Sequence, residues 1–226
     1  MDLERGIGGG TGDDTGSGTG DGTDAAAVFD ALGADYERAF AASPAHLDSL
    51  RRLIDALPPG SRVLDVGSGT GRPTARTLVD AGHHIQGIDV SPVMVELASR
   101  QVPEASFLRA DIRTTDLADA SFDAVCVYFS LLQMDRTEQA DVLRRLARAL
   151  VPGGLLAVAT VPLDVEATDV VFMGQTVRVT SFGADAFAAT VTASGFSVLW
   201  QEAGLFAPDH ADATPEPQLF LHARRD

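Results

Sequence analysis

Short apolar runs alternate with segments of helical spacing through the middle of the chain. Five runs are typical of buried strands, and they lie at residues 63–66, 83–89, 106–111, 122–130 and 155–161. Between them, apolar residues recur every three or four positions, most clearly over residues 93–101 and 136–150. A turn is expected at residues 151–154. This alternation predicts an α/β chain built on a doubly wound parallel sheet.

The two ends of the chain follow other patterns. Helical spacing covers residues 25–42, and Ser43 and Pro44 open a second helix before the first strand. After Pro162 come a hairpin pattern, a helical pattern and two terminal strand patterns, at residues 172–182, 184–195, 196–202 and 218–225.

Residues 1–24 differ in composition from the rest of the chain. Between residues 6 and 24 only Ile7 is apolar. Such a stretch buries too little surface to offset an ordering cost of roughly 1–2 kcal/mol per residue. We therefore expect a disordered Gly/Asp/Thr-rich tail over residues 1–24 and a single domain over residues 25–226. Within that domain, residues 25–58 are expected to form an N-terminal helical cap.

Composition narrows the range of functions. The 226 residues carry a formal net charge of −15, which disfavours binding to nucleic acids and anionic membranes. Cys126 is the only cysteine, so an intrachain disulfide and a cysteine-built zinc site are both excluded. No apolar run reaches the ~18 residues of a membrane helix, and no signal-peptide pattern is visible. These features favour a cytoplasmic protein.

The sequence "GSGTG" occurs twice, at residues 16–20 and 67–71. The first copy lies in the expected tail, with no strand before it. The second copy follows a strand and precedes a helix. Because ligands of open α/β sheets bind at the carboxyl ends of the strands, the second copy is the candidate ligand loop.

Two ligand classes use such a loop together with an acid on the next strand: nicotinamide dinucleotides and S-adenosylmethionine. Asp89 lies 22 residues after Gly67, which suits either class. A dinucleotide loop has the pattern G-x-G-x-x-G, which would need glycine at position 72, where Arg72 stands. The observed spacing favours S-adenosylmethionine.

The sequence here resembles the class I S-adenosylmethionine-dependent methyltransferases, especially small-molecule enzymes of bacterial natural-product type. The matching motifs follow in order: "VLDVGSGTG", "GIDVS", "RADI", "FDAVCVYFSLLQM" and "ALVPGGLLAV". The resemblance implies a Rossmann-like sheet of seven strands. The sheet would be mostly parallel, with an antiparallel C-terminal strand and helices on both faces. It also implies S-adenosylmethionine as cofactor. No bound metal is expected, because the sequence offers neither a cysteine-built site nor a clear cluster of acidic residues.

The resemblance assigns roles in the first motif. The backbone of Gly67, Ser68 and Gly69 would pass under the methionine and ribose of the cofactor, and Gly71 completes the pattern. Asp65 would orient the amino group of the methionine part. Asp65 capping the end of its strand is the structural alternative.

The resemblance also assigns roles after the later strands. Asp89 would accept hydrogen bonds from both ribose hydroxyls. Val90 and Met94 would pack on the adenine. Asp111 and the backbone of Ile112 would contact the adenine amino group. Tyr128 would border the methionine part. The structural alternatives are a strand-end cap for Asp111 and a core position for Met94.

Three residues are candidates for acting on the substrate: Gln133, Tyr36 and His46. Related small-molecule enzymes often carry histidine where "SLLQ" places Gln133, and glutamine orients a substrate but is not a base at neutral pH. Capping the next helix or facing solvent is the alternative for Gln133. Tyr36 and His46 lie in the helical cap.

Residues 162–182 are expected to form an insert on the substrate side. Its residues Phe172, Met173 and Phe182 form either an apolar lid or part of the packing on the sheet. We expect in-line methyl transfer to oxygen, nitrogen or carbon of a small, partly apolar metabolite, in bacterial secondary metabolism, by a monomer or homodimer. The alternative is a cofactor-binding fold without methyl transfer, either a cofactor-assisted cyclase or a regulatory binding protein.

Overall fold

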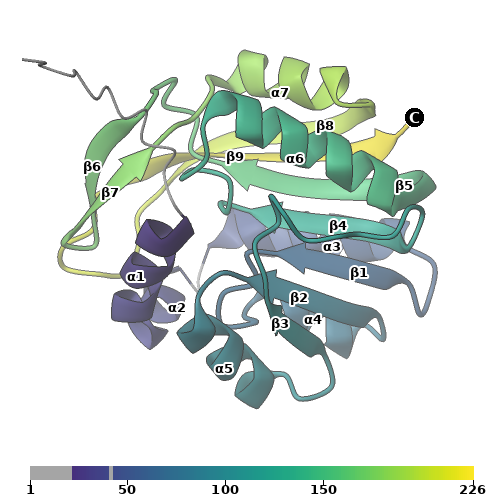
Figure 1. Ribbon diagram of the computed structural model, residues 1–226, viewed down its shortest axis with the longest axis horizontal. Helices are drawn as coiled ribbons and strands as arrows, with labels where there is room; N and C mark the ends of the chain where they lie inside the picture. The colour runs from purple at the N-terminus through teal and green to yellow at the C-terminus, as the bar shows by residue number, and fades with distance from the viewer. Residues whose placement is uncertain (1–21, 41–42) are drawn as a thin grey trace, which may run out of the picture.

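The computed structural model describes residues 22–40 and 43–226, which form an α/β fold around one large sheet (Figure 1). The strand order is β3-β2-β1-β4-β5-β9-β8. Neighbouring strands from β3 to β5 pair in parallel, whereas β9 is antiparallel to both β5 and β8. The strands are β1 (Arg62–Val66), β2 (His84–Asp89), β3 (Ser106–Arg109), β4 (Phe122–Tyr128), β5 (Leu150–Thr160), β8 (Phe196–Phe206) and β9 (Glu216–Arg225).

Helices cover both faces of this sheet. The helices are α1 (Gly22–Leu32), α2 (Ala34–Phe40), α3 (Pro44–Ala56), α4 (Thr74–Asp80), α5 (Pro92–Gln101), α6 (Arg136–Ala149) and α7 (Ala184–Ala193). Leu143 of α6 and Phe187 of α7 are buried in a core cluster on one face. Leu50 of α3 and Leu78 of α4 belong to a second cluster on the other face. The predicted doubly wound, seven-stranded architecture is confirmed.

Further elements gather at the carboxyl ends of the parallel strands. A separate hairpin of β6 (Thr168–Phe172) and β7 (Gln175–Val179) lies at this end, within the expected insert. Figure 1 shows this hairpin on the left, with α1 and α2 below it. A third apolar cluster joins them through Leu32, Ala39 and Met173. The helical cap and the hairpin therefore lie together at the carboxyl ends of the parallel strands.

Some predicted boundaries differ from the structure. The single helix expected over residues 25–42 is two helices that break at Gly33, and the first begins at Gly22. Residues 1–21 of the expected tail lie outside the described residues. Residues 151–154, expected as a turn, belong to β5, where the pairing with β4 is irregular between Phe122 and Ala124. Leu150 pairs with Phe122 and Leu155 pairs with Ala124, so residues 151–154 form an irregular stretch within the strand that is longer than the segment of β4 beside it.

The C-terminal strand is antiparallel, as expected, with Ala157 opposite His222. It lies inside the sheet, between β5 and β8, so β8 forms the edge. This placement buries the apolar side chains of β9 on both faces, including Phe220 and Leu221.

Candidate functional site

Three adjoining cavities lie at the carboxyl ends of the strands. The first, which we call the strand-end cavity, is lined by the glycine loop, the ends of β2 and β4 and the segment after β3. The second, the apolar cavity, has a volume of about 290 Å³ and lies between α1, α2, the hairpin and the β8–β9 loop. The third, the polar recess, lies on the α3 and α4 side of the glycine loop.

The glycine loop is held tightly against neighbouring strands. The backbone N–H groups of Gly67 and Ser68 both donate to the carbonyl oxygen of Ile88, at 2.8 and 3.0 Å. Gly67 has a φ of +69°, and a Cβ atom there would lie 2.2 Å from the Cβ of Ser130. Only glycine fits at this position, because the left-handed conformation and the close contact both exclude a side chain.

Asp89 connects this loop to the end of β2. Its Oδ2 accepts a hydrogen bond from the N–H of Gly69 at 2.9 Å, and its Oδ1 accepts one from the N–H of Ser91 at 2.9 Å. Burial raises the pKa of Asp89, and these backbone donors partly oppose that effect. Gly67, Gly69 and Asp89 all line the strand-end cavity.

Three buried polar atoms of the polar recess have no protein partner. Asp65 Oδ2, Ser68 Oγ and Thr70 Oγ1 are each without a hydrogen-bond partner among the described residues. Asp65 is 2% exposed. Burial, followed by repulsion from Asp89, raises the pKa of Asp65 to about 7. Because buried polar groups are almost always satisfied, these atoms mark a place for a polar ligand.

Gly71 has a packing role in the structure. A Cβ atom at this position would lie 3.1 Å from Val102 Cγ2 and 3.3 Å from Phe107 Cζ. The third glycine of the loop thus allows close contact with the chain around α5 and β3.

The strand-end cavity is also lined by the residues that we expect, from the sequence, beside the adenine. Val90, Met94, Asp111 and Ile112 all line it. Met94 is also buried in the core, at 1% exposure. Burial opposes ionisation of Asp111, but hydrogen bonds from Arg113, including one of 2.7 Å from Nη2 to Oδ2, outweigh it and lower the pKa.

Tyr128 and His46 pack against each other beside the glycine loop. Their ring centroids are 4.2 Å apart. The Tyr128 hydroxyl is hydrogen-bonded to Ser49 Oγ at 2.9 Å, and His46 Nε2 is 3.1 Å from Thr74 Oγ1. Burial lowers the pKa of His46 to about 3, so the imidazole is neutral. His46 lines the polar recess and not the apolar cavity, and this position gives no support to a role as substrate base.

Gln133 and Tyr36 lie where two cavities meet. Both residues, together with Phe29 and Phe129, line the strand-end cavity and the apolar cavity. Gln133 does not cap α6, because Asp135 forms a capping box with Glu138 there. The Tyr36 ring stacks on Phe40, with centroids 5.0 Å apart.

The three aromatic and methionine residues placed either in a lid or in the packing on the sheet divide between two locations. Phe172 and Met173 line the apolar cavity, but Phe182 is not among the lining residues. The Phe182 ring contacts Phe187 of α7, and the guanidinium of Arg136 lies 4.9 Å from its centroid. Phe182 therefore packs against α6 and α7 and does not line the apolar cavity.

Sequence reasoning missed several lining residues. Phe129 and Ser130 directly follow β4, so their place at the ligand edge of the sheet was a usable signal. Phe29 lies in a segment that the periodicity predicts to be helical, but the sequence does not show against which surface this helix packs. Glu216 begins the last strand after a polar, proline-containing loop, and no sequence pattern places it at the apolar cavity.

The described part of the chain has neither a cluster of metal ligands nor a membrane-spanning helix. Across residues 22–40 and 43–226, no group of three or more His, Cys, Asp and Glu side chains is arranged to hold a metal ion. In the same ranges, every helix is too short or too polar to span a membrane.

Sequence comparison finds methyltransferases. Residues 63–154 match the family described as a methyltransferase domain. A demethylmenaquinone methyltransferase of Renibacterium salmoninarum is 37% identical over 111 residues, which are 48% of this chain and 46% of that protein. The chain spans about half the length of the curated relatives it matches.

Solved structures share the fold. A 1,6-didemethyltoxoflavin N1-methyltransferase of Burkholderia thailandensis, bound to 1,6-didemethyltoxoflavin and S-adenosylhomocysteine, has a TM-score of 0.68 at 21% identity, covering 89% of this chain and 87% of that one. The [4+2]-cyclase SpnF has a TM-score of 0.62 at 25% identity, covering 77% and 80%. The matched domain over residues 63–154, the common fold and the five ordered motifs around the glycine loop make this chain similar to the class I S-adenosylmethionine-dependent methyltransferases.

Proposed function

We propose that this protein transfers a methyl group from S-adenosylmethionine to a small, partly apolar metabolite held in the apolar cavity. The observation that carries the proposal is the shared wall of two cavities. Phe29, Tyr36, Phe129 and Gln133 border both the strand-end cavity and the apolar cavity. A ligand in each cavity would meet at these four side chains.

The residues present fit the cofactor. S-adenosylmethionine supplies an activated methyl group on a sulfonium, together with an ammonium, a carboxylate and two ribose hydroxyls. The unpartnered Asp65 Oδ2 and Ser68 Oγ are suited to the polar groups of its methionine part. Asp89, fixed by backbone N–H groups at the edge of the cavity, is suited to the ribose. Val90 and Met94 supply apolar surface for the adenine.

The chemistry asks little of the protein beyond alignment. In an in-line displacement with an activated leaving group, correct positioning is worth roughly 7–11 kcal/mol. Gln133 and Tyr36 would hold the accepting atom, and the surrounding aromatic rings would exclude water. Burial, with the nearby charges of Glu216 and Asp89, raises the pKa of Tyr36, so its hydroxyl stays protonated. The apolar lining of the second cavity supports a partly apolar substrate. Its origin in bacterial secondary metabolism is part of the proposal.

Isotope transfer tests the proposal directly. Purified protein is incubated with methyl-labelled S-adenosylmethionine and a panel of phenols, quinols, amines and hydroxylated polyketides. We expect label to appear in at least one compound, with equimolar S-adenosylhomocysteine. Cofactor binding without label transfer to any member of a broad panel would contradict it.

A second candidate function is a cyclisation that uses the fold and the cofactor without methyl transfer. The similarity to the [4+2]-cyclase SpnF favours it. The two candidates differ in one product, because a cyclase would convert its substrate without forming S-adenosylhomocysteine. Substrate consumption at constant S-adenosylmethionine concentration would identify the cyclase.

A further inference from the structure

The apolar cavity contains one carboxylate. Among the described residues that line it, most are aliphatic, aromatic or proline, and Glu216 is the only one that is Asp, Glu, Lys, Arg or His. No arginine or histidine lies among these lining residues. Arg178 of β7 is exposed, and its Nε donates to the carbonyl oxygen of Ala167 at 3.1 Å.

Glu216 is held by a buried amide. Gln218 is 2% exposed, and its Nε2 donates to Glu216 Oε1 at 2.9 Å. The hydroxyl of Ser43, itself 4% exposed, donates to Gln218 Oε1 at 3.5 Å. These two bonds fix which end of the amide faces Glu216. One carboxylate oxygen is thereby occupied, and Oε2 retains its capacity to accept.

The surroundings make this carboxylate a strong acceptor. Burial raises the pKa of Glu216, and the hydrogen bond from Gln218 partly opposes the rise. No ion pair links Glu216 to a positively charged side chain within the described residues. A half-buried carboxylate without a cation gains most from a ligand that donates an O–H or N–H group.

We infer that Glu216 selects the methyl acceptor by accepting a hydrogen bond from an O–H or N–H group on it. The inference rests on the proposed function and deepens it. Glu216 lines the apolar cavity but not the strand-end cavity, whereas Gln133 lines both. The acceptor is therefore an apolar molecule with two features: a reacting atom near Gln133 and a neutral or cationic donor at the Glu216 end. Carboxylates and phosphates are rejected by like-charge repulsion in an apolar enclosure.

Calorimetric binding of matched probes tests this without turnover. The probes are 2-naphthol and 2-naphthoate, which share an apolar body and differ in donor and charge. Each is titrated at pH 8 into protein saturated with S-adenosylhomocysteine. We expect the wild type to bind 2-naphthol at least tenfold more tightly than 2-naphthoate. In Glu216→Gln, which keeps shape and removes charge, the preference should shrink to threefold or less. Glu202→Gln, on the exposed face of β8, is the matched control and should keep the wild-type preference.

The variant Gln218→Met tests separately whether Gln218 positions Glu216. This variant removes the amide donor but keeps side-chain volume. If Gln218 positions Glu216, the preference should fall between those of the wild type and Glu216→Gln, with S-adenosylhomocysteine affinity unchanged. A merely structural role would weaken both probes equally and leave their ratio as in the wild type.

The outcomes separate this inference from the proposed function. A wild type that binds S-adenosylhomocysteine but shows no preference between the probes, or binds neither at millimolar concentration, would overturn the role of Glu216. A Glu216→Gln variant with the full preference would overturn it as well. A wild type that does not bind S-adenosylhomocysteine would instead refute the proposed function.

Discussion

Asp65 is a buried carboxylate whose surroundings, in the protein alone, oppose its charge. It is 2% exposed, its Oδ2 has no partner among the described residues, and Asp89 adds repulsion. A folded protein retains such a group where a ligand offsets its cost. The polar recess beside the glycine loop is that place, and the pKa of Asp65 provides a way to test it.

The stability of the protein without ligand should fall as pH rises through the range set by Asp65. Its pKa is raised from 3.8 to about 7. Between these values the folded state binds a proton more tightly than the unfolded state, so raising the pH removes stability, up to about 4 kcal/mol. Asp65→Asn should therefore be more stable than the wild type at pH 8, with little difference at pH 4. Urea denaturation at both pH values measures this. An equal effect of the substitution at the two pH values would contradict it.

Gln133 should orient the substrate without taking its proton. Gln133→Ala should lower the methyl-transfer rate roughly 2- to 12-fold, the value of one neutral hydrogen bond of about 0.5–1.5 kcal/mol. Gln133→His should retain activity and add a dependence on pH near 6–7, which steady-state rates across pH would reveal. Gln201→Ala, exposed on β8, is the control. A wild-type rate in Gln133→Ala would disprove this role.

At the scale of elements, the glycine loop depends on how closely β1 and β4 lie at their ends. Ser130 follows β4, and its hydroxyl donates to the carbonyl oxygen of Val66 at 2.8 Å. Gly67 packs against the side chain of Ser130, which leaves no room for a Cβ atom at position 67. The loop is thus shaped by contacts across the sheet as well as by its own glycines.

Gly67→Ala should destabilise the fold and weaken S-adenosylmethionine binding. A positive φ and a contact of 2.2 Å together cost roughly 1–3 kcal/mol, because Ser130 and the loop must both shift. Gly204→Ala on β8, where a Cβ would meet nothing within 4 Å, is the matched control. Thermal denaturation and calorimetry should show losses for the first variant alone, and unchanged values for Gly67→Ala would contradict the geometry.

The elements differ in how far the sequence predicts them. The five parallel strands and their helices carry local periodicity, and the glycine loop follows a strand, so the fold and the positions of Gly67 and Asp89 were predictable. Whether β9 lies at the edge or inside the sheet depends on nonlocal pairing. The break at Gly33 and the capping role of Asp135 are local, but the docking of Phe29 and Glu216 onto one cavity depends on tertiary packing.

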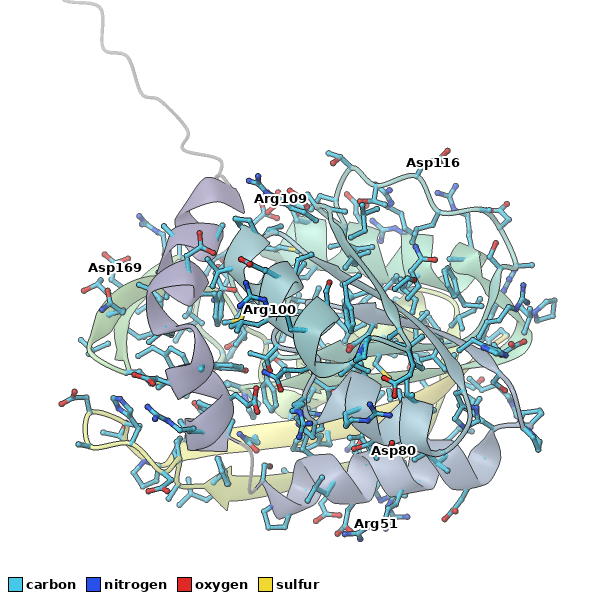
Figure 2. The ribbon with its side chains drawn as sticks, turned by 90° about the horizontal axis from the view of Figure 1, so that it is seen from below. Arg51, Asp80, Arg100, Arg109, Asp116 and Asp169 are labelled. Carbon is cyan, nitrogen blue, oxygen red and sulfur yellow. The ribbon has the colours of Figure 1, made fainter. Side chains whose placement is uncertain are left out.

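At the scale of the whole molecule, the charge distribution suits a cationic cofactor. The net charge is −15, and the labelled carboxylates Asp116 and Asp169 lie at the periphery of the molecule (Figure 2). An acidic surface attracts a sulfonium and an ammonium and repels polyphosphates. The acidic surface and the buried carboxylates of the site thus favour the same kind of ligand.

The described cavity residues begin at Phe29, which gives a prediction for the N-terminal segment. Removal of residues 1–21 should leave S-adenosylmethionine affinity within twofold of the full-length value, measured by calorimetry. A loss of tenfold or more would mean that the segment contributes to the site.

The proposed S-adenosylmethionine site is tested most directly by calorimetric titration of this cofactor into three proteins. They are the wild type, Asp89→Asn and the exposed control Asp116→Asn. Charge-assisted hydrogen bonds contribute roughly 1.5–3 kcal/mol, so Asp89→Asn should weaken binding about 10- to 150-fold. The wild type and Asp116→Asn should bind one equivalent with equal affinity. Equal affinity in all three proteins, or a wild type that prefers a nicotinamide dinucleotide, would contradict the account.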